Sequence, residues 1–300
     1  MARRSTGTAD EMSDARPTAV LFPGQASQTA GMRDAVAAER PDLLEAAAEA
    51  VGDDPFEHVD EGTEFAQPAI FCASVTAWSS LPDPRPAALA GHSLGEFAAL
   101  VAADAVSTED ALGLVVQRGR LMAEAAAAEG GGGMLAVLGG SPDEAAEIAA
   151  RHDLTVANDN APGQVVLSGA ADSLERAGTE TRERGAKAVP LRVAGAFHSP
   201  AMAPVVPEFR AALERVEFSP PRTPVVSSTT AAPFDDVRER LAMALTSPIR
   251  WRETLLRLRD EMGVRSFVET GPGKVLTGLV KRTLGGVERR AARPMETSRA

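Results

Sequence analysis

Cysteine, long apolar runs and signs of a membrane or secretory segment are all scarce in this sequence. Cys72 is the only cysteine, so the chain cannot form an internal disulfide, and its neighbours Phe71 and Trp78 predict a small core residue. No apolar run approaches the ~20 residues that span a bilayer, and the polar start, Met1 to Arg16, lacks the apolar stretch of a secretory signal. We therefore expect a cytoplasmic protein with no membrane segment.

Basic charge is also in deficit, with 31 Lys and Arg against 42 Asp and Glu, a formal net charge of -11. Such a balance argues against nucleic acid as a partner, because phosphate binding needs a basic surface. The balance is uneven, however, since residues 250–290 alone carry a local charge of +5. This segment is either a set of solvated helix faces or a surface for an acidic partner. Its basic residues are Arg250, Arg252, Arg257, Arg259, Arg265, Lys274, Lys281, Arg282, Arg289 and Arg290.

Cofactor motifs are missing as well. The run Gly271-Pro272-Gly273-Lys274 lacks the earlier glycine and the following Ser or Thr of a P-loop, and no G-x-G-x-x-G follows a strand. Neither an H-E-x-x-H motif nor a paired-cysteine metal motif occurs. We expect no nucleotide cofactor and no metal.

The apolar pattern predicts alternating strands and helices. A strand at 18–22 ends at Pro23-Gly24, and a second apolar run at 87–90 leads through Gly91 to Glu96 into a helix. Alternation of this kind implies a largely parallel sheet flanked by helices, the α/β class. The other elements predicted for this part are helices at 41–51, 67–81, 204–216, 236–245, 251–262 and from 275, with strands at 224–227 and 265–269.

A second unit is predicted after the glycine run 130–133, which closes a helix capped by Ser107 and is hard to place inside any element. The pattern beyond it reads strand, helix, strand, strand, helix, strand, the order of a ferredoxin-like unit. We predict an insertion at 131–193 in a main domain made of 17–130 and 194–290, with disordered tails at 1–16 and 291–300. The elements predicted for the insertion are strands 134–138, 154–157, 164–167 and 188–193 and helices 142–151 and 172–184.

The candidate nucleophile is Ser93, in the G-x-S-x-G run Gly91-His92-Ser93-Leu94-Gly95. At a tight turn from strand to helix, the glycines remove clashes and leave the serine oxygen exposed. The alternative is a serine that caps the next helix. In either case the free N–H groups of the helix start would stabilise negative charge beside Ser93.

A base must take the serine proton, and the chain has four histidines. His58 and His152 stand among charged residues and are predicted to be surface groups. His92 adjoins the serine, where neighbouring side chains diverge. His198 lies in a small, apolar loop where the chain re-enters the main domain, and we prefer it as the base over a purely structural histidine.

Arg118 interrupts the apolar stripe of its helix, at a position where the period calls for an apolar residue. A guanidinium turned toward the core needs an anion. That anion is either an acidic side chain in a structural ion pair or the carboxylate of a substrate held in the bidentate manner that arginine favours.

Taken together, these segments resemble the malonyl-CoA:acyl carrier protein transacylases and the acyltransferase domains of polyketide synthases. The resemblance spans nearly the whole chain and implies an α/β-hydrolase-like domain with a ferredoxin-like insertion. Seven blocks carry it, in the family order: Phe22 to Gln28, Gly91 to Glu96, Gln117 to Gly119, Asn160 to Gln164, Gly195 to Ser199, Ser247 to Trp251 and Glu269 to Lys274.

The resemblance implies a role for each candidate residue. Ser93 would carry the acyl group, His198 would act as base and then acid, and Arg118 would hold the free carboxylate of a malonyl group. Backbone N–H groups of Gln25 and Leu94 would form the oxyanion hole. Phe197 and His92 would contribute to the substrate site, with Leu94 and Phe197 typical of malonyl-selective members. Malonyl-CoA and an acyl carrier protein would be the substrates of a ping-pong reaction, and the family suggests a monomer.

Two departures from the family pattern bear on this transfer of roles. Ala26 replaces a usual glycine in the first loop, which is acceptable only if the backbone there keeps a negative φ. Ala244 stands where the family usually has a glutamine that orients the histidine, largely through its main-chain carbonyl. Because alanine keeps that carbonyl, we predict that His198 remains functional.

Two other functions stay open. An acyl-serine can also be released to water, so a serine hydrolase is possible, although no triad carboxylate is evident and Arg118 argues for a transferase. A non-catalytic homologue that binds the carrier protein would keep the fold without the chemistry, and Ala244 leaves that alternative open.

Overall fold

The computed structural model describes residues 16–82, 84–128, 132–193 and 195–292. A five-stranded sheet forms the centre of the main domain, in the order β7-β2-β1-β8-β9, and every adjacent pair is parallel. Its strands are β1 (Thr18–Phe22), β2 (Ala88–Gly91), β7 (Val225–Val226), β8 (Ser266–Glu269) and β9 (Glu288–Ala291).

Helices cover both faces of this sheet, which explains why its central strands β1 and β2 are largely apolar and buried, whereas the edge strand β9 is polar and mostly exposed. Along β1, Val20 and Phe22 join the large core cluster on one face, whereas Ala19 and Leu21 join a second cluster on the other. The cluster on the first face includes residues of α1 (Met32–Glu39), α2 (Pro41–Val51), α3 (Thr63–Ser79), α4 (Gly95–Ala102), α5 (Thr108–Ala128) and α8 (Val206–Leu213), and the cluster on the second face includes residues of α10 (Trp251–Asp260) and α11 (Val275–Thr283). A 3-10 helix, η1 (Pro200–Val205), precedes α8, and α9 (Val237–Met243) follows β7.

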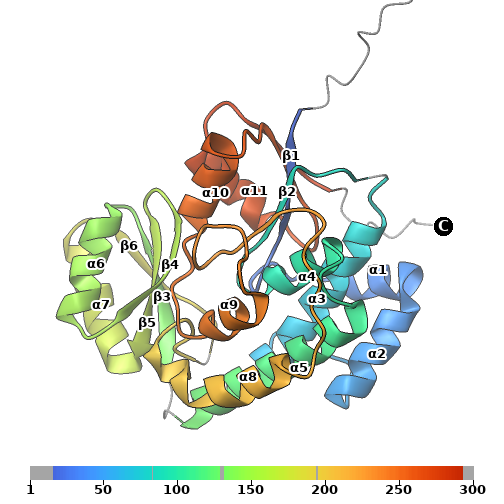
Figure 1. Cartoon of the computed structure of the whole chain (residues 1–300). Coiled ribbons are helices and arrows are strands. Elements are labelled where there is room, and N and C mark those ends of the chain that lie inside the picture. Colours follow the sequence, from blue (N-terminus) through green and yellow to red (C-terminus); the bar gives the residue numbers. More distant parts are fainter. Residues whose placement is uncertain (1–15, 83, 129–131, 194, 293–300) are drawn as a thin grey trace, which may run out of the picture.

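A separate four-stranded antiparallel sheet, in the order β4-β5-β3-β6, lies to one side of the molecule with two helices packed against it (Figure 1). Along the chain its elements are β3 (Gly132–Leu138), α6 (Pro142–Arg151), β4 (Thr155–Ala161), β5 (Gln164–Ala170), α7 (Ala171–Glu183) and β6 (Lys187–Pro190). This is the predicted order of strand and helix. The fold class, a parallel α/β domain with an antiparallel ferredoxin-like subdomain, is therefore confirmed.

The subdomain is fastened to the main domain through β4. The amide of Asp159 donates to the Ile249 carbonyl and the amide of Ile249 donates to the Ala157 carbonyl, each at 2.8 Å. The Asp159 carboxylate also accepts from both Nε and Nη2 of Arg252 on α10, at 3.0 and 2.6 Å. Backbone bonds and a bidentate ion pair together fix the relative placement of the two sheets.

Several predicted boundaries are wrong. Gly132 and Gly133 do not form a joint. They are the first two residues of β3 and pair with Ala170 and Gly169 of β5. Ala196 packs so close to Gly132 that a side chain there would clash with it. Helix α3 begins at Thr63, four residues before the predicted start, and accommodates Pro68 within its second turn. The short helix α1 and the strand β9 were not predicted.

Other expectations concern the ends and the surface. Ala291 lies in β9 and the Ala292 amide donates to the Glu269 carbonyl at 2.7 Å, so these two residues are not part of a disordered tail. The rest of that prediction, for 1–15 and 293–300, lies outside the described residues. No helix in the described ranges has both the length and the apolar character needed to cross a membrane.

The loop after β1 differs from expectation at Ala26, whose φ is 72° rather than negative. Left-handed backbone places an alanine Cβ close to its own carbonyl oxygen, at a cost of roughly 1–2 kcal/mol. The loop therefore keeps the backbone shape that suits a glycine even though the glycine has been replaced.

We predict that Ala26→Gly stabilises the protein by about 0.5–1 kcal/mol, because the steric cost disappears and outweighs the added freedom of the unfolded chain. The matched control is Ala150→Gly, at an exposed site in α6, which should destabilise by about the same amount. Urea unfolding curves measure both. A loss of stability in both variants would contradict the strain at residue 26.

Candidate active site

The turn between β2 and α4 presents Ser93 in a strained backbone conformation, with a φ of 51°. Glycine is required on both sides of it. A Cβ at Gly91 would lie 2.0 Å from the backbone carbon of Gly95, and one at Gly95 would lie 2.1 Å from the carbonyl oxygen of Phe22. The G-x-S-x-G pattern therefore reflects a close approach of β1, β2 and α4 that leaves no room for side chains.

The serine is not a helix cap. Helix α4 begins at Gly95, its N-cap residue is Leu94, and no side chain caps it. The Ser93 hydroxyl instead lies 2.9 Å from Nε2 of His198 and accepts a hydrogen bond from Nη2 of Arg118, also at 2.9 Å. The alternative in which Ser93 caps the helix is wrong, and the three candidate side chains from distant parts of the sequence meet at one oxygen.

His198 is 5% exposed and its backbone is also left-handed, with a φ of 56°. Its Nδ1 lies 2.8 Å from the Ala244 carbonyl oxygen. Because a carbonyl only accepts, Nδ1 carries the proton and Nε2 is free to accept the proton of Ser93. Burial, and next the positive charge of Arg118, lower the pKa of His198 to about 3, so the imidazole is neutral near pH 7.

Arg118 on α5 is 2% exposed. Its Nη1 donates to Oε1 of Gln67 at 2.6 Å, and its guanidinium lies 5.9 Å from the centre of the Phe97 ring. Within the described residues no carboxylate forms an ion pair with it, so of the two alternatives the structural ion pair is wrong. Burial lowers the pKa of Arg118 to about 10, partly offset by the negative charge of Glu96. A buried guanidinium that lacks a carboxylate partner among the described residues has the chemistry to bind an anionic group beside Ser93.

A chain of polar side chains connects Arg118 to the loop after β1, and sequence reasoning missed it. Gln67 on α3 is fully buried, and its Nε2 donates to the Thr63 hydroxyl at 2.8 Å. Thr63 donates in turn to Oε1 of Gln25 at 3.0 Å. The available signal was a glutamine on a helix that is apolar on nearly every side, a position where a polar group needs a partner.

The two predicted oxyanion donors lie at the two loops that meet at Ser93. The backbone N–H groups of Gln25 and Leu94 have no acceptor among the described residues. A Cβ at Gly24 would lie 2.6 Å from the His92 carbonyl oxygen, so the first loop lies directly against the turn that carries Ser93. The N–H of Ser93 itself is occupied, since it donates to the Ser228 hydroxyl at 3.4 Å.

The remaining predicted residues, His92 and Phe197, do not hydrogen-bond to the Ser93 hydroxyl. Nε2 of His92 lies 2.8 Å from Oδ1 of Asn160 in β4, and its ring packs on Trp251 at a centroid distance of 5.2 Å. Burial lowers the pKa of His92. Phe197 is buried in the large core cluster. The structure thus brings together Ser93, His198 and Arg118, and places His92 at the contact with the subdomain.

The other histidines and the cysteine are accounted for elsewhere. His58 lies beside Asp53 and Glu61, and His152 beside Glu180; their side chains are 29% and 17% exposed, so the two predicted surface histidines are only partly exposed. Cys72 is fully buried, and burial raises the pKa of its thiol to about 12. Cys72 is therefore a core residue, as the sequence predicts.

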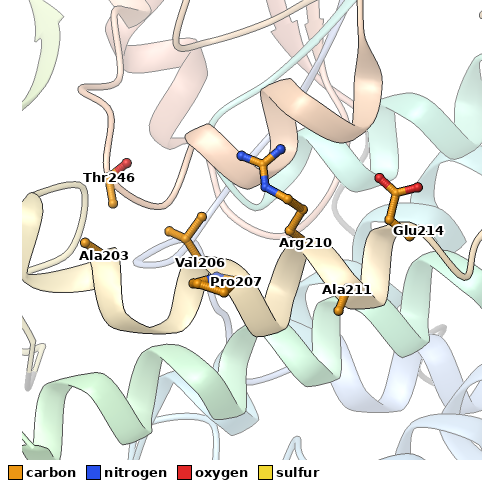
Figure 2. Close-up of a pocket in the computed structure, with 7 residues that line it drawn as sticks. All are labelled: Ala203, Val206, Pro207, Arg210, Ala211, Glu214 and Thr246. Atoms are coloured by element: carbon orange, nitrogen blue, oxygen red, sulfur yellow. The ribbon is translucent and has the colours of Figure 1, made fainter.

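A surface depression of about 610 Å³ lies along η1 and α8 (Figure 2), and its lining does not include Ser93, His198 or Arg118. Thr246, at one end of it, follows shortly after Ala244, the residue whose carbonyl contacts His198. Its lining is mostly apolar: Ala203, Val206, Pro207, Arg210, Ala211, Glu214 and Thr246.

Comparison with known proteins matches almost the entire chain. A model of the acyl transferase domain family matches residues 20–297. The polyketide biosynthesis protein ThaF of Burkholderia thailandensis is 41% identical over 295 residues, which cover 92% of this chain but 25% of ThaF. The malonyl CoA-acyl carrier protein transacylase of Haemophilus influenzae is 36% identical over 292 residues, which cover 90% of this chain and 93% of that protein.

Among solved structures, a malonyl-transacylase in complex with a type II polyketide synthase acyl carrier protein has a TM-score of 0.84 and 34% identity. The match covers 94% of this chain and 97% of that one. The similarity therefore extends through both the parallel and the antiparallel sheets.

The contact of His198 with a main-chain carbonyl generates a prediction for residue 244. We expect Ala244→Gln to change the reactivity of Ser93 by less than about 10-fold, because the carbonyl that orients the imidazole is already present. The rate of labelling by a serine-directed fluorophosphonate measures this. His198→Ala is the control and should lower the rate by ~10²-fold or more. A rise of orders of magnitude in Ala244→Gln would show that the alanine disables the base.

Proposed function

This chain belongs to the acyl transferase family, and we propose that it moves a malonyl group from malonyl-CoA to the phosphopantetheine thiol of an acyl carrier protein. The observation that carries the proposal is that a base and a buried cation both lie 2.9 Å from the oxygen of Ser93, and that the cation has no carboxylate partner among the described residues. A base and a strained serine support acyl transfer, and the cation supports an acyl group with a free carboxylate.

In the first half of the reaction, Nε2 of His198 takes the hydroxyl proton as Oγ of Ser93 attacks the thioester carbonyl carbon. The carbonyl oxygen becomes negative and is bound by the free N–H groups of Gln25 and Leu94, each such donor being worth ~10²-fold or more in rate. The carbon–sulfur bond then breaks, coenzyme A leaves with the proton from His198, and an ester remains on Ser93.

The second half repeats these steps in reverse with a different thiol. His198 takes the proton of the carrier thiol, the sulfur attacks the ester carbonyl, and the Ser93 oxygen leaves with that proton. A neutral His198 is required at the start of both halves, and its lowered pKa of about 3 supports this. The reaction is thus ping-pong and needs no further cofactor.

Arg118 selects the acyl group. In the free protein its Nη2 donates to the Ser93 hydroxyl and Nη1 to Gln67, which leaves its other N–H groups for the malonyl carboxylate. A carboxylate in this buried setting would be held by charge-assisted bonds worth ~1.5–3 kcal/mol. We further propose that Leu94 and Phe197, each next to a reacting residue in sequence, favour malonyl over methylmalonyl, and that His92 borders the same site.

We predict that malonyl-CoA leaves a malonyl adduct on the wild type and none on Ser93→Ala. Arg118→Ala should be loaded by malonyl-CoA about 10- to 100-fold more slowly, because the carboxylate loses its charge-assisted bonds. Intact mass after incubation with malonyl-CoA, methylmalonyl-CoA or acetyl-CoA measures both effects. Cys72→Ala, a core change away from the site, should keep the adduct.

The outcomes separate the competing functions. No adduct from any donor would favour a non-catalytic homologue, and an adduct from acetyl-CoA alone would discard the role of Arg118. An adduct that is lost to water as fast without a carrier protein as with one would indicate a serine hydrolase.

We propose that the carrier protein docks on the part of the 250–290 segment whose basic charge is free. Four of its arginines already form ion pairs: Arg250 with Glu253, Arg252 with Asp159, Arg257 with Glu261 and Arg259 with Asp260. Within the described residues the other six have no carboxylate partner: Arg265, Lys274, Lys281, Arg282, Arg289 and Arg290. These six supply the excess charge that an acidic partner would meet on an otherwise acidic protein.

Reversing charge at Lys281 and Arg282, both exposed at the end of α11, should raise the KM for the carrier protein about 10-fold and leave Ser93 loading unchanged. Steady-state transfer kinetics and loading assays measure the two effects. The control, Arg215→Glu with Arg222→Glu, makes the same change in net charge at another exposed surface. An unchanged KM in the first variant, or an equal rise in both, would place the docking site elsewhere.

A monomeric state and a cytoplasmic location remain predictions from the sequence. The relatives include polyketide biosynthesis proteins and malonyl CoA-acyl carrier protein transacylases. The proposed chemistry is the same for a carrier protein of fatty acid or of polyketide synthesis, so it applies to either.

A further inference from the structure

A buried carboxylate beside the active site takes no part in the reaction described above. Glu96 lies in the first turn of α4 and is 1% exposed. Burial raises the pKa of its carboxyl to about 7, although donors from Ser228 and the charge of Arg118 oppose that rise. Burying a carboxyl group costs free energy unless hydrogen bonds compensate for the lost water, so its hydrogen-bond partners indicate its role.

Those partners lie on another element. Oε1 of Glu96 accepts from the backbone N–H of Ser228 at 2.6 Å and from the Ser228 hydroxyl at 2.9 Å. Ser228 follows β7, and its carbonyl accepts from the Arg250 amide at 2.6 Å. The Glu96 carboxylate therefore does not cap its own helix. It binds both the amide and the hydroxyl of Ser228, and Arg250 binds the Ser228 carbonyl, so the position of this hydroxyl is fixed.

The fixed hydroxyl reaches the nucleophile. While donating to Glu96, the oxygen of Ser228 accepts a hydrogen bond from the N–H of Ser93 at 3.4 Å. Ser93 has a φ of 51°, a conformation that its own side chain disfavours and that persists only where the surroundings impose it. A hydrogen bond to this N–H restrains the peptide before Ser93, the one whose rotation would relieve the strain.

We propose that Glu96 is a positioning residue that holds the nucleophile through Ser228: its carboxylate fixes the Ser228 hydroxyl, which holds the Ser93 peptide in the left-handed turn. This inference rests on the proposed function of Ser93 as the acyl carrier. The link keeps Oγ directed at His198. It also occupies the N–H of Ser93, so that the N–H of Leu94 is the one left at this turn to bind the oxyanion.

A purely structural role for the link predicts a different behaviour. If Glu96 and Ser228 only hold α4 to the loop after β7, their loss lowers the folded fraction and leaves the reactivity of each folded molecule unchanged. If they position Ser93, the folded molecules themselves react more slowly. The distinction requires a rate constant for the reactive fraction, with the final extent of labelling measured separately.

The experiment measures fluorophosphonate labelling of Ser93 and single-turnover loading by malonyl-CoA and acetyl-CoA in four variants. We expect Ser228→Ala and Glu96→Ala to lower the rate constants about 10-fold with the probe and with both donors, at unchanged half-saturating donor concentration. Ser228→Thr, which keeps the hydroxyl, should restore most of the rate. Ser74→Ala removes a buried hydroxyl that has no partner among the described residues and should leave the rate unchanged.

Three results would overturn the proposal: unchanged rate constants with a reduced final extent of labelling, a loss in Ser228→Thr as large as in Ser228→Ala, or a loss confined to malonyl-CoA. The last would mean that Glu96 acts through the charge of Arg118. The probe does not depend on malonyl transfer. A wild type that labels but does not load would therefore refute the proposed function alone, and the comparison of labelling rates would still decide the role of Glu96.

Discussion

The active site depends on the burial of one guanidinium. Arg118 has lost its water and has no direct carboxylate partner among the described residues, so its charge acts on everything nearby. It requires Gln67 as an acceptor, and it helps to lower the pKa of His198. A substrate carboxylate would neutralise the cation in place and so remove one of the causes of that low pKa, the burial of the imidazole being the largest. Recognition of the acyl group and readiness of the base are thus coupled by electrostatics.

Two left-handed residues, and close backbone approaches that only glycine allows, give the site its shape. Ser93 and His198 both have positive φ, which places the nucleophile and the base on loops that their own side chains disfavour. Behind them, the loop after β8 backs the loop that carries Gln25. A Cβ at Gly273 would lie 2.7 Å from the Ser27 carbonyl oxygen. Glu269 secures that backing loop by accepting from the amides of Leu276 and Thr277 at the start of α11.

The antiparallel subdomain contributes to the site through its attachment rather than through a reacting group. Its strand β4 holds His92 through Asn160 and holds α10 through Asp159. The chain leaves the subdomain after β6 and reaches His198 eight residues later. A displacement of this sheet would therefore move the wall beside Ser93 and the segment that carries the base. This explains why the insertion is joined to the main domain by backbone bonds as well as by an ion pair.

The sequence by itself determined the α/β class, the order of the strands and helices in the insertion, and the candidates Ser93, His198 and Arg118. Those inferences rest on local features: apolar periodicity, a glycine-flanked serine, and a charge on an apolar stripe. Tertiary structure alone decided that Gly132 and Gly133 belong to a strand, because their partners lie in β5, and it alone showed that the backbone of Ala26 is left-handed. It alone revealed Gln67 and the link from Glu96 through Ser228 to Ser93. The hydrogen bonds from Arg118 to Gln67, from Ser228 to Glu96 and from Ser93 to Ser228 each join residues more than 50 positions apart in sequence. Hydrogen bonds over such a separation leave no periodic pattern in a single sequence.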